Sequence, residues 1–248
     1  MQICLISNAS VYTDAALHSL LAHPEIKIAG LVKCTSVVGK RDDWRAYKDL
    51  ILRSGPLYAG YLGAVTKPAY RLPHVPKWKS MSVWAHSLQC PILRTTDVSA
   101  PQTLDFIESC QPDMILTVHL GQILNAAFYE RFAGNTYNIH PGKLPIYKGP
   151  DPVFHAIMEN EQAFTVSLHE SIQRVDAGKV LAEKTVVPTR RTLFRTNLEL
   201  FSKAGQLVGS HFLGKNDCKP VPDDRAPRYR SWPTNGEVLR FLARGHRL

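Results

Sequence analysis

An amide and an imidazole stand two residues apart at Asn138 and His140, directly before a loop rich in proline and glycine. Residues 136–140 have the pattern of a short strand, in which side chains two apart point to the same face. Asn138 and His140 could therefore both donate hydrogen bonds to one oxygen on which negative charge develops. A histidine with a purely structural role would show the same pattern, so this pair alone does not identify a function.

A second group of polar residues follows the first. Ser167 and His169 stand two apart in residues 163–170, which alternate like a strand. Asp176 and Gly178 precede another alternating run, 179–188, and predict a tight turn that joins the two strands. Taken alone, an Asp-Ala-Gly sequence is typical of a plain turn and needs no chemical role.

The elements around these residues alternate between strands and helices. Short apolar runs predict strands, and apolar residues at helical spacing predict helices between them. Such alternation favours an α/β fold with a Rossmann-like, doubly wound and mostly parallel sheet, whose sites lie where the strands end. The expected strands are 2–7, 27–32, 91–94, 113–118 and 136–140, and the expected helices are 14–22, 103–110, 126–132, 192–213 and 236–243.

Between residues 54 and 80 this alternation breaks. Gly55 and four prolines in this stretch argue against long regular elements and predict an insertion. Its basic side chains favour an anionic substrate, although a solvated basic loop would look the same; they are Lys67, Arg71, Lys77 and Lys79. We expect one large unit over residues 1–214 and a short basic C-terminal extension over 215–248.

Composition limits the class of protein. The 248 residues are 44% hydrophobic and 21% charged, which is typical of a globular chain, and the net charge of +9 favours anionic partners. The five cysteines form no Cys-x-x-Cys pair, which argues against a disulfide framework or a zinc site and favours reduced thiols in the cytoplasm. No apolar run is long enough to predict a membrane span.

Together, the two polar segments resemble those of the folate-dependent formyltransferase family, which includes methionyl-tRNA, glycinamide ribonucleotide and sugar N-formyltransferases. The resemblance covers roughly residues 1–214. The positions that match the family's motif, in order, are Asn138, Ile139, His140, Leu144, Pro145, Tyr147, Gly149, Ser167, His169, Asp176 and Gly178.

The resemblance implies roles for these residues. Asn138, His140 and Asp176 would be the catalytic residues for moving a formyl group from 10-formyltetrahydrofolate to an amine, without a metal. Ser167 and His169 would hold Asp176 in place. The pterin of the donor would bind the loop after residue 118 and the Asp-x-Gly turn; the candidates there are Leu120, Gln122, Ile123, Leu124, Val175 and Gly178.

Departures from the family narrow the expected substrate. Residues 7–12 carry no glycine, unlike the phosphate loop of the ribonucleotide branch, and the residues after 214 are too few for the extra barrel of the tRNA branch. We expect a small or carrier-borne amine that is anionic, such as a nucleotide-linked amino sugar, and neither a nucleic acid nor a membrane partner; a homodimer stays open. The alternatives are an acyltransferase with a non-folate donor and a non-catalytic relative that binds a nucleotide or RNA.

Overall fold

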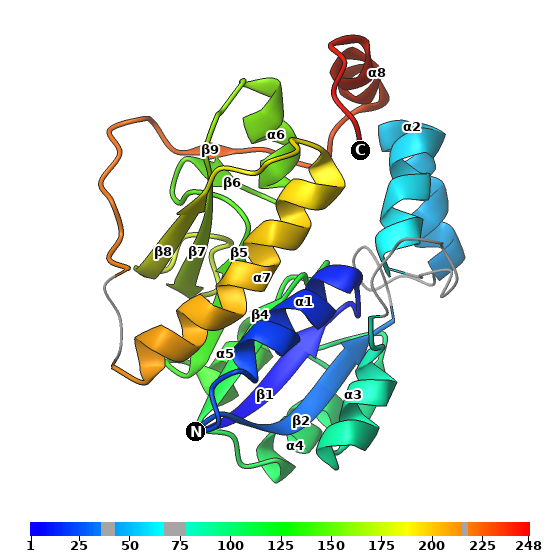
Figure 1. The fold of residues 1–248 in the computed structure, drawn as a ribbon. Helices are drawn as coiled ribbons and strands as arrows, with labels where there is room; N and C mark the ends of the chain where they lie inside the picture. Colours follow the sequence, from blue (N-terminus) through cyan, green and yellow to red (C-terminus); the bar gives the residue numbers. More distant parts are fainter. Residues whose placement is uncertain (36–42, 67–77, 215–217) are drawn as a thin grey trace.

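A seven-stranded sheet forms the centre of the computed structural model, which describes residues 1–35, 43–66, 78–214 and 218–248. The strand order is β3-β2-β1-β4-β5-β7-β8, in which the first five strands are parallel and β7 and β8 are antiparallel (Figure 1). The expected Rossmann-like, mostly parallel sheet is confirmed. The strands are β1 (Gln2–Ser7), β2 (Lys27–Cys34), β3 (Ile92–Thr95), β4 (Met114–Val118), β5 (Thr136–His140), β7 (Phe164–Glu170) and β8 (Val180–Val186).

Helices cover both faces of this sheet, and β1 shows why. Its residues are apolar at consecutive positions, so Ile3 and Leu5 enter one core while Cys4 and Ile6 enter another. The first core is closed by α1, α3 and α7, and the second by α4 and α5. The bounds are α1 (Val11–Leu20), α3 (Met81–Leu88), α4 (Pro101–Ser109), α5 (Ala126–Phe132), α6 (Pro152–Met158) and α7 (Leu193–Phe212).

The prediction of an insertion without long elements is wrong for its first half. Residues Asp43–Thr66 form the helix α2, which kinks at Gly55, where φ is +80°. Glycine adopts this angle without steric cost, and Pro56 then begins the second half of the helix, where a missing N–H costs little. The prediction for residues 67–77, including Lys67, Arg71 and Lys77, lies outside the described residues.

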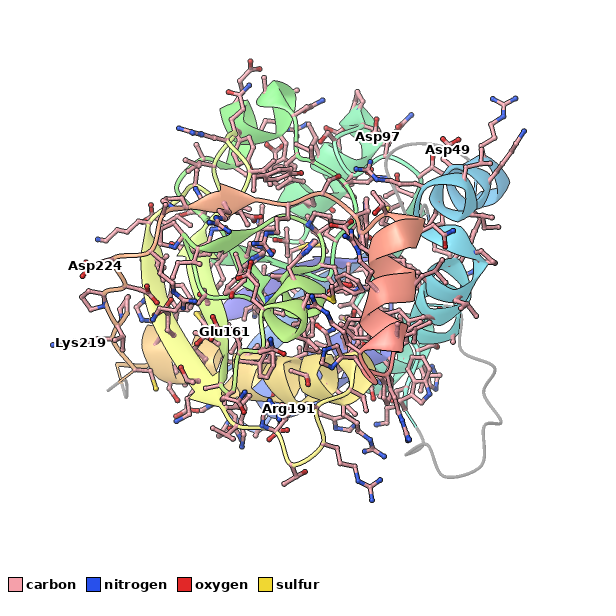
Figure 2. All side chains as sticks on the ribbon, turned by 90° about the horizontal axis from the view of Figure 1, so that it is seen from above. Asp49, Asp97, Glu161, Arg191, Lys219 and Asp224 are labelled. Carbon is pink, nitrogen blue, oxygen red and sulfur yellow. The ribbon has the colours of Figure 1, made fainter. Side chains whose placement is uncertain are left out.

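The C-terminal residues fold back onto the body of the molecule. The short strand β9 (Arg228–Tyr229) pairs in parallel with β6 (Tyr147–Lys148), in the loop that follows β5. The helix α8 (Asn235–Ala243) packs against α2, and both views show the two side by side (Figures 1 and 2). In Figure 2 the chain crosses from Lys219 and Asp224 at one rim of the molecule to α8 on the other side.

Two sequence expectations concern cysteines and membranes. All five cysteines are free thiols, and Cys4 and Cys34 are buried. Within the described ranges, no helix combines the length and the apolar character that a bilayer crossing needs.

Candidate active site

The predicted catalytic residues meet where β5 ends. Asn138 and His140 lie on β5, and their cross-strand neighbours on β7 are His169 and Ser167. Asp176 lies on the connection from β7 to β8 with a φ of +48°, a left-handed conformation that aspartate tolerates better than most residues. Three segments of the chain thus bring an amide, two imidazoles and a carboxylate to one edge of the sheet.

Hydrogen bonds fix the amide of Asn138. Its Oδ1 accepts from Thr117 Oγ1 at 2.8 Å, and its Nδ2 donates to His169 Nε2 at 3.0 Å. His169 Nδ1 donates to the carbonyl of Glu170 at 2.7 Å, so the proton lies on Nδ1 and Nε2 accepts. Burial, together with the charge of His140, lowers the pKa of His169 to about 4, which keeps its ring neutral at pH 7. The second N–H of Asn138 is left for the cavity that this residue lines.

His140 and Asp176 form a buried pair. The Nε2 of His140 donates to the backbone carbonyl of Tyr147 at 2.6 Å, because a carbonyl can only accept. Its Nδ1 then faces Asp176 Oδ1 at 3.7 Å, which is longer than a direct hydrogen bond. The other oxygen, Oδ2, accepts from the backbone N–H of Gly149 at 2.8 Å. One carboxylate oxygen is thus held by the backbone, while the other faces His140 and, at 3.8 Å, His169 Nε2.

Ser167 does not hold Asp176 as expected. Its hydroxyl donates to the carbonyl of Gly142 at 2.8 Å and lies 3.1 Å from Glu183 Oε1, and it accepts from the N–H of Leu144 at 3.3 Å. Ser167 shares the strand face of His169 but lies one step further from the turn, opposite His140. It therefore fastens the loop after His140, whereas His169 contacts both Asn138 and Asp176.

Two cavities meet at these residues. The larger has a volume of about 490 Å³ and is lined by Asn138, His140 and Asp176 among others. The smaller, of about 100 Å³, is lined by Asn138, His169 and Asp176. Asn138 and Asp176 border both, so two molecules bound in the two cavities could meet beside them.

The predicted donor-binding residues fall into three groups. Leu120, Gln122, Ile123 and Val175 line both cavities, and Leu124 lines the smaller. Ile123 is 64% exposed, as a residue that contacts a ligand would be, whereas the Gln122 side chain is bonded to the backbone of Val98 and Thr96. Gly178 lines neither cavity. A Cβ there would lie 1.9 Å from the carbonyl oxygen of Glu170, so Gly178 permits close packing of the backbone.

The opposite wall of the large cavity was not predicted. It consists mainly of apolar and aromatic residues from α2, α7 and the C-terminal tail, with two hydroxyl-bearing residues: Leu62, Phe201, Tyr229 and Trp232, together with Thr66 and Ser231. The helix α2 is anchored by Tyr58, whose hydroxyl donates at 2.5 Å to Asp151, a buried carboxyl whose pKa burial raises to about 6. No sequence signal marked this wall, because it is assembled from segments without a shared pattern.

Lys79 was one of the basic side chains of the insertion that were expected to favour an anionic substrate. It lies in a separate hollow beside α1, with its Nζ 4.4 Å from the centre of the Trp84 ring. Among the described residues, the lining of the large cavity includes no lysine or arginine. The described residues also form no cluster of three or more metal-ligating side chains.

Curated proteins with similar sequences are named methionyl-tRNA formyltransferases. Residues 72–193 match the formyl transferase family model. Methionyl-tRNA formyltransferase of Chloroflexus aggregans is 30% identical over 163 residues, which cover 64% of this chain and 52% of the relative. The corresponding protein of Anaplasma marginale is 28% identical over 170 residues, which cover 68% of this chain and 56% of the relative. The chain thus spans about half the length of these curated relatives.

Solved structures share the fold at lower identity. A glycinamide ribonucleotide transformylase from Symbiobacterium toebii superposes with a TM-score of 0.59 at 12% identity, covering 92% of this chain and 93% of that one. An N-formyltransferase from Helicobacter canadensis, solved with folinic acid and dTDP-3-aminofucose, gives 0.52 at 13% identity, covering 93% and 70%. The solved structures thus share the fold of this chain, and residues 72–193 match the formyl transferase family model.

Proposed function

We propose that this protein transfers a formyl group from 10-formyltetrahydrofolate to the amine of a small or carrier-borne substrate. The observation that carries the proposal is that Asn138 and Asp176 line both cavities, with the Nδ1 of His140 3.7 Å from Asp176 Oδ1. A transfer reaction needs two bound molecules whose reacting atoms touch, and only groups placed at that contact can act on both.

The smaller cavity and its rim suit the pterin of the donor. Ile123, Ile172 and Val175 are 64%, 43% and 36% exposed, and a flat ring laid over them would remove this apolar surface from water. The backbone from Leu120 to Leu124 offers polar groups at the ring's edge. The bound donor would supply a formyl carbon that an amine can attack.

The chain's own residues would stabilise charge and move protons. As the amine nitrogen bonds to the formyl carbon, the free N–H of Asn138 stabilises the negative charge on the formyl oxygen. His140, whose Nε2–H is held by the Tyr147 carbonyl, adds the positive charge of its ring when Nδ1 also carries a proton. Asp176 accepts the proton that the amine loses, directly or through a water. When the bond from the formyl carbon to the folate nitrogen breaks, that nitrogen takes up a proton, and the products are a formamide and tetrahydrofolate.

The larger cavity would hold the acceptor. Its outer wall presents the aromatic rings of Tyr229 and Trp232 and the hydroxyl of Ser231. Such a wall suits an acceptor with a flat or apolar part beside its amine, and a nucleotide-linked amino sugar is one such molecule. The basic side chains that would favour an anionic acceptor would lie outside the described lining of the cavity.

A screen of amines with 10-formyltetrahydrofolate, which follows tetrahydrofolate release, tests the activity. Nucleotide-linked amino sugars and simple amino sugars form the panel. We expect release that depends on both enzyme and amine, and that is at least about 10²-fold slower with Asp176→Asn.

The donor is tested separately by thermal shift. Saturating 5-formyltetrahydrofolate should raise the melting temperature, because a ligand that binds only the folded state stabilises it. A shift with an acyl-CoA and none with the folate would favour a non-folate acyltransferase. Folate binding without any turnover would favour a non-catalytic relative.

A further inference from the structure

Two backbone groups of one short loop hold the two buried catalytic candidates. The carbonyl of Tyr147 accepts from His140 Nε2 at 2.6 Å, and the N–H of Gly149 donates to Asp176 Oδ2 at 2.8 Å. His140 and Asp176 are only 5% and 9% exposed as side chains, so little water competes for these bonds. Residues 147–149 therefore set the orientation of both groups.

The same loop is in turn held by the C-terminal tail. The N–H of Arg228 donates to the carbonyl of Ile146 at 3.1 Å, and the N–H of Arg230 donates to the carbonyl of Lys148 at 3.0 Å. At Gly149, where φ is +110°, a Cβ would lie 1.8 Å from the carbonyl oxygen of Arg230. The two backbones are therefore in direct contact at the residue that holds Asp176.

Side chains add a second attachment. The guanidinium groups of Arg225 and Arg230 lie 5.8 and 5.9 Å from the centre of the Tyr147 ring. The Tyr147 hydroxyl lies 2.7 Å from both Glu159 and Glu161, and these glutamates form ion pairs with Arg230 and Arg225, respectively. Tyr147 is thus enclosed by the tail on one side and by the residues around α6 on the other.

We propose that residues 228–230 act as a brace that positions His140 and Asp176 through the backbone of residues 147–149. The inference rests on the proposed function, and it assigns to the tail a part in the chemical step. Residues 228–230 are positioning residues, since they reach the catalytic groups only through the loop. The brace lies outside residues 72–193, the segment that matches the family model.

Arg230→Pro tests the brace, and Arg230→Ala is its matched control. Proline removes the N–H that bonds Lys148, whereas alanine removes the same side chain and keeps that N–H. We expect kcat of Arg230→Pro to fall by about 10- to 100-fold, the cost of displacing reacting groups by a fraction of an ångström to one ångström. KM for the donor should stay within about 2-fold, and Arg230→Ala, which loses the side-chain attachment but keeps the N–H, should lose clearly less kcat than Arg230→Pro. Equal losses in both variants would overturn the proposal.

Arg228→Pro is a second variant, because proline is best tolerated at the first residue of a strand. It removes the N–H that bonds Ile146 and should also lower kcat selectively; a stably folded Arg228→Pro with wild-type kcat contradicts the brace.

A spectroscopic test needs no activity. In ¹⁵N spectra of the histidine rings, the wild type should show the Nε2 proton of His140 protected from exchange with water, and both proline variants should show faster exchange of that proton. An unchanged His140 spectrum in both variants overturns the brace. A wild type that formylates no amine would instead refute the proposed function, and the spectra would still decide on the brace.

Discussion

The two walls of the large cavity are built in different ways. On the wall formed by the sheet, Asn138, His140 and Asp176 are held by hydrogen bonds to strands or loops of the core. On the wall formed by α2 and the tail, the lining is apolar and aromatic, and Tyr229 is 60% exposed. Chemistry requires groups fixed in direction, whereas recognition of an acceptor requires mainly shape and apolar contact. Substitutions on the two walls should therefore affect different kinetic constants.

The largest effect is expected on the sheet wall, from Asp176→Asn. Asparagine tolerates the φ of +48° and keeps an oxygen for the Gly149 N–H, but it cannot accept a proton. We expect kcat to fall by at least about 10²-fold, the usual contribution of a general base. Steady-state kinetics would show this, and an unchanged melting temperature would establish that the fold is intact. Turnover within a few-fold of the wild type would remove Asp176 from the mechanism.

Asn138→Ala should cost about as much, because the loss of one donor to a developing oxyanion typically lowers kcat by about 10²–10³-fold. It also leaves His169 Nε2 without the N–H that it accepts at 3.0 Å. Combined with Asp176→Asn, the loss should be far smaller than the product of the two single losses, since the residues act on one step. Losses that multiply would mean that the two residues serve separate steps.

The contrast between the walls also explains what the sequence could predict. Alternation and strand-end position located Asn138 and His140, and the turn residues Asp176 and Gly178 located the hairpin of β7 and β8, as observed. The resemblance to a known family supplied their roles, which stay predictions.

The other wall could not be predicted from local patterns. Gly55 and Pro56 indicate a break, yet the helix resumes after one non-helical residue. The strand β9 has only two residues, too few for any periodic signal. The hydrogen bonds to Tyr147 O and Gly149 N involve backbone atoms. Because residues of every type carry these atoms, the residue types at 147 and 149 do not predict the bonds.

On the wall of α2 and the tail, Tyr229→Ala should act on binding. The removal of an exposed aromatic contact should raise KM for the acceptor by about 10-fold, or roughly 1–2 kcal/mol, with kcat within a few-fold. Leu239→Ala is the control, because Leu239 is similarly exposed, at 53%, but does not line the cavity. A Tyr229→Ala enzyme with reduced kcat and normal KM would contradict the assignment of this wall to acceptor binding.

Gly178→Ala separates packing from ligand binding at the hairpin. The added Cβ would lie 1.9 Å from the carbonyl oxygen of Glu170, so the backbone must shift. We expect a loss of about 1–3 kcal/mol in the free energy of unfolding, as for other overpacked sites. Denaturant titration measures this loss, and titration with 5-formyltetrahydrofolate should give a nearly unchanged Kd. Weaker folate binding at unchanged stability would restore the original assignment of Gly178 to the donor site.

The smallest effect concerns pH. Burial lowers the pKa of His119 to about 4, as it does for His169, so the unfolded chain takes up protons that the folded protein refuses between pH 6.5 and 4. The free energy of unfolding should therefore fall as the pH decreases through this range. Asp151, whose pKa is raised to about 6, opposes the trend, because it is protonated in the folded state first.

His119→Asn isolates one histidine, since asparagine does not titrate and accepts the φ of +47°. Urea titrations at pH 6.5 and pH 4 should show a smaller difference in the free energy of unfolding for this variant than for the wild type. The same difference in both proteins would mean that His119 takes up its proton equally in the folded and unfolded states.

The most direct test of the proposed chemistry follows the formyl carbon itself. Wild-type protein and Asp176→Asn are incubated with 10-formyltetrahydrofolate labelled with ¹³C in the formyl group and with the best amine of the screen. Mass spectrometry then measures labelled formamide, after thermal shift has established that both proteins bind the folate. We predict rapid labelling of the amine by the wild type and at least about 10²-fold slower labelling by Asp176→Asn. Equal labelling by the two proteins, or none by a wild type that binds the donor, would contradict formyl transfer at Asn138, His140 and Asp176.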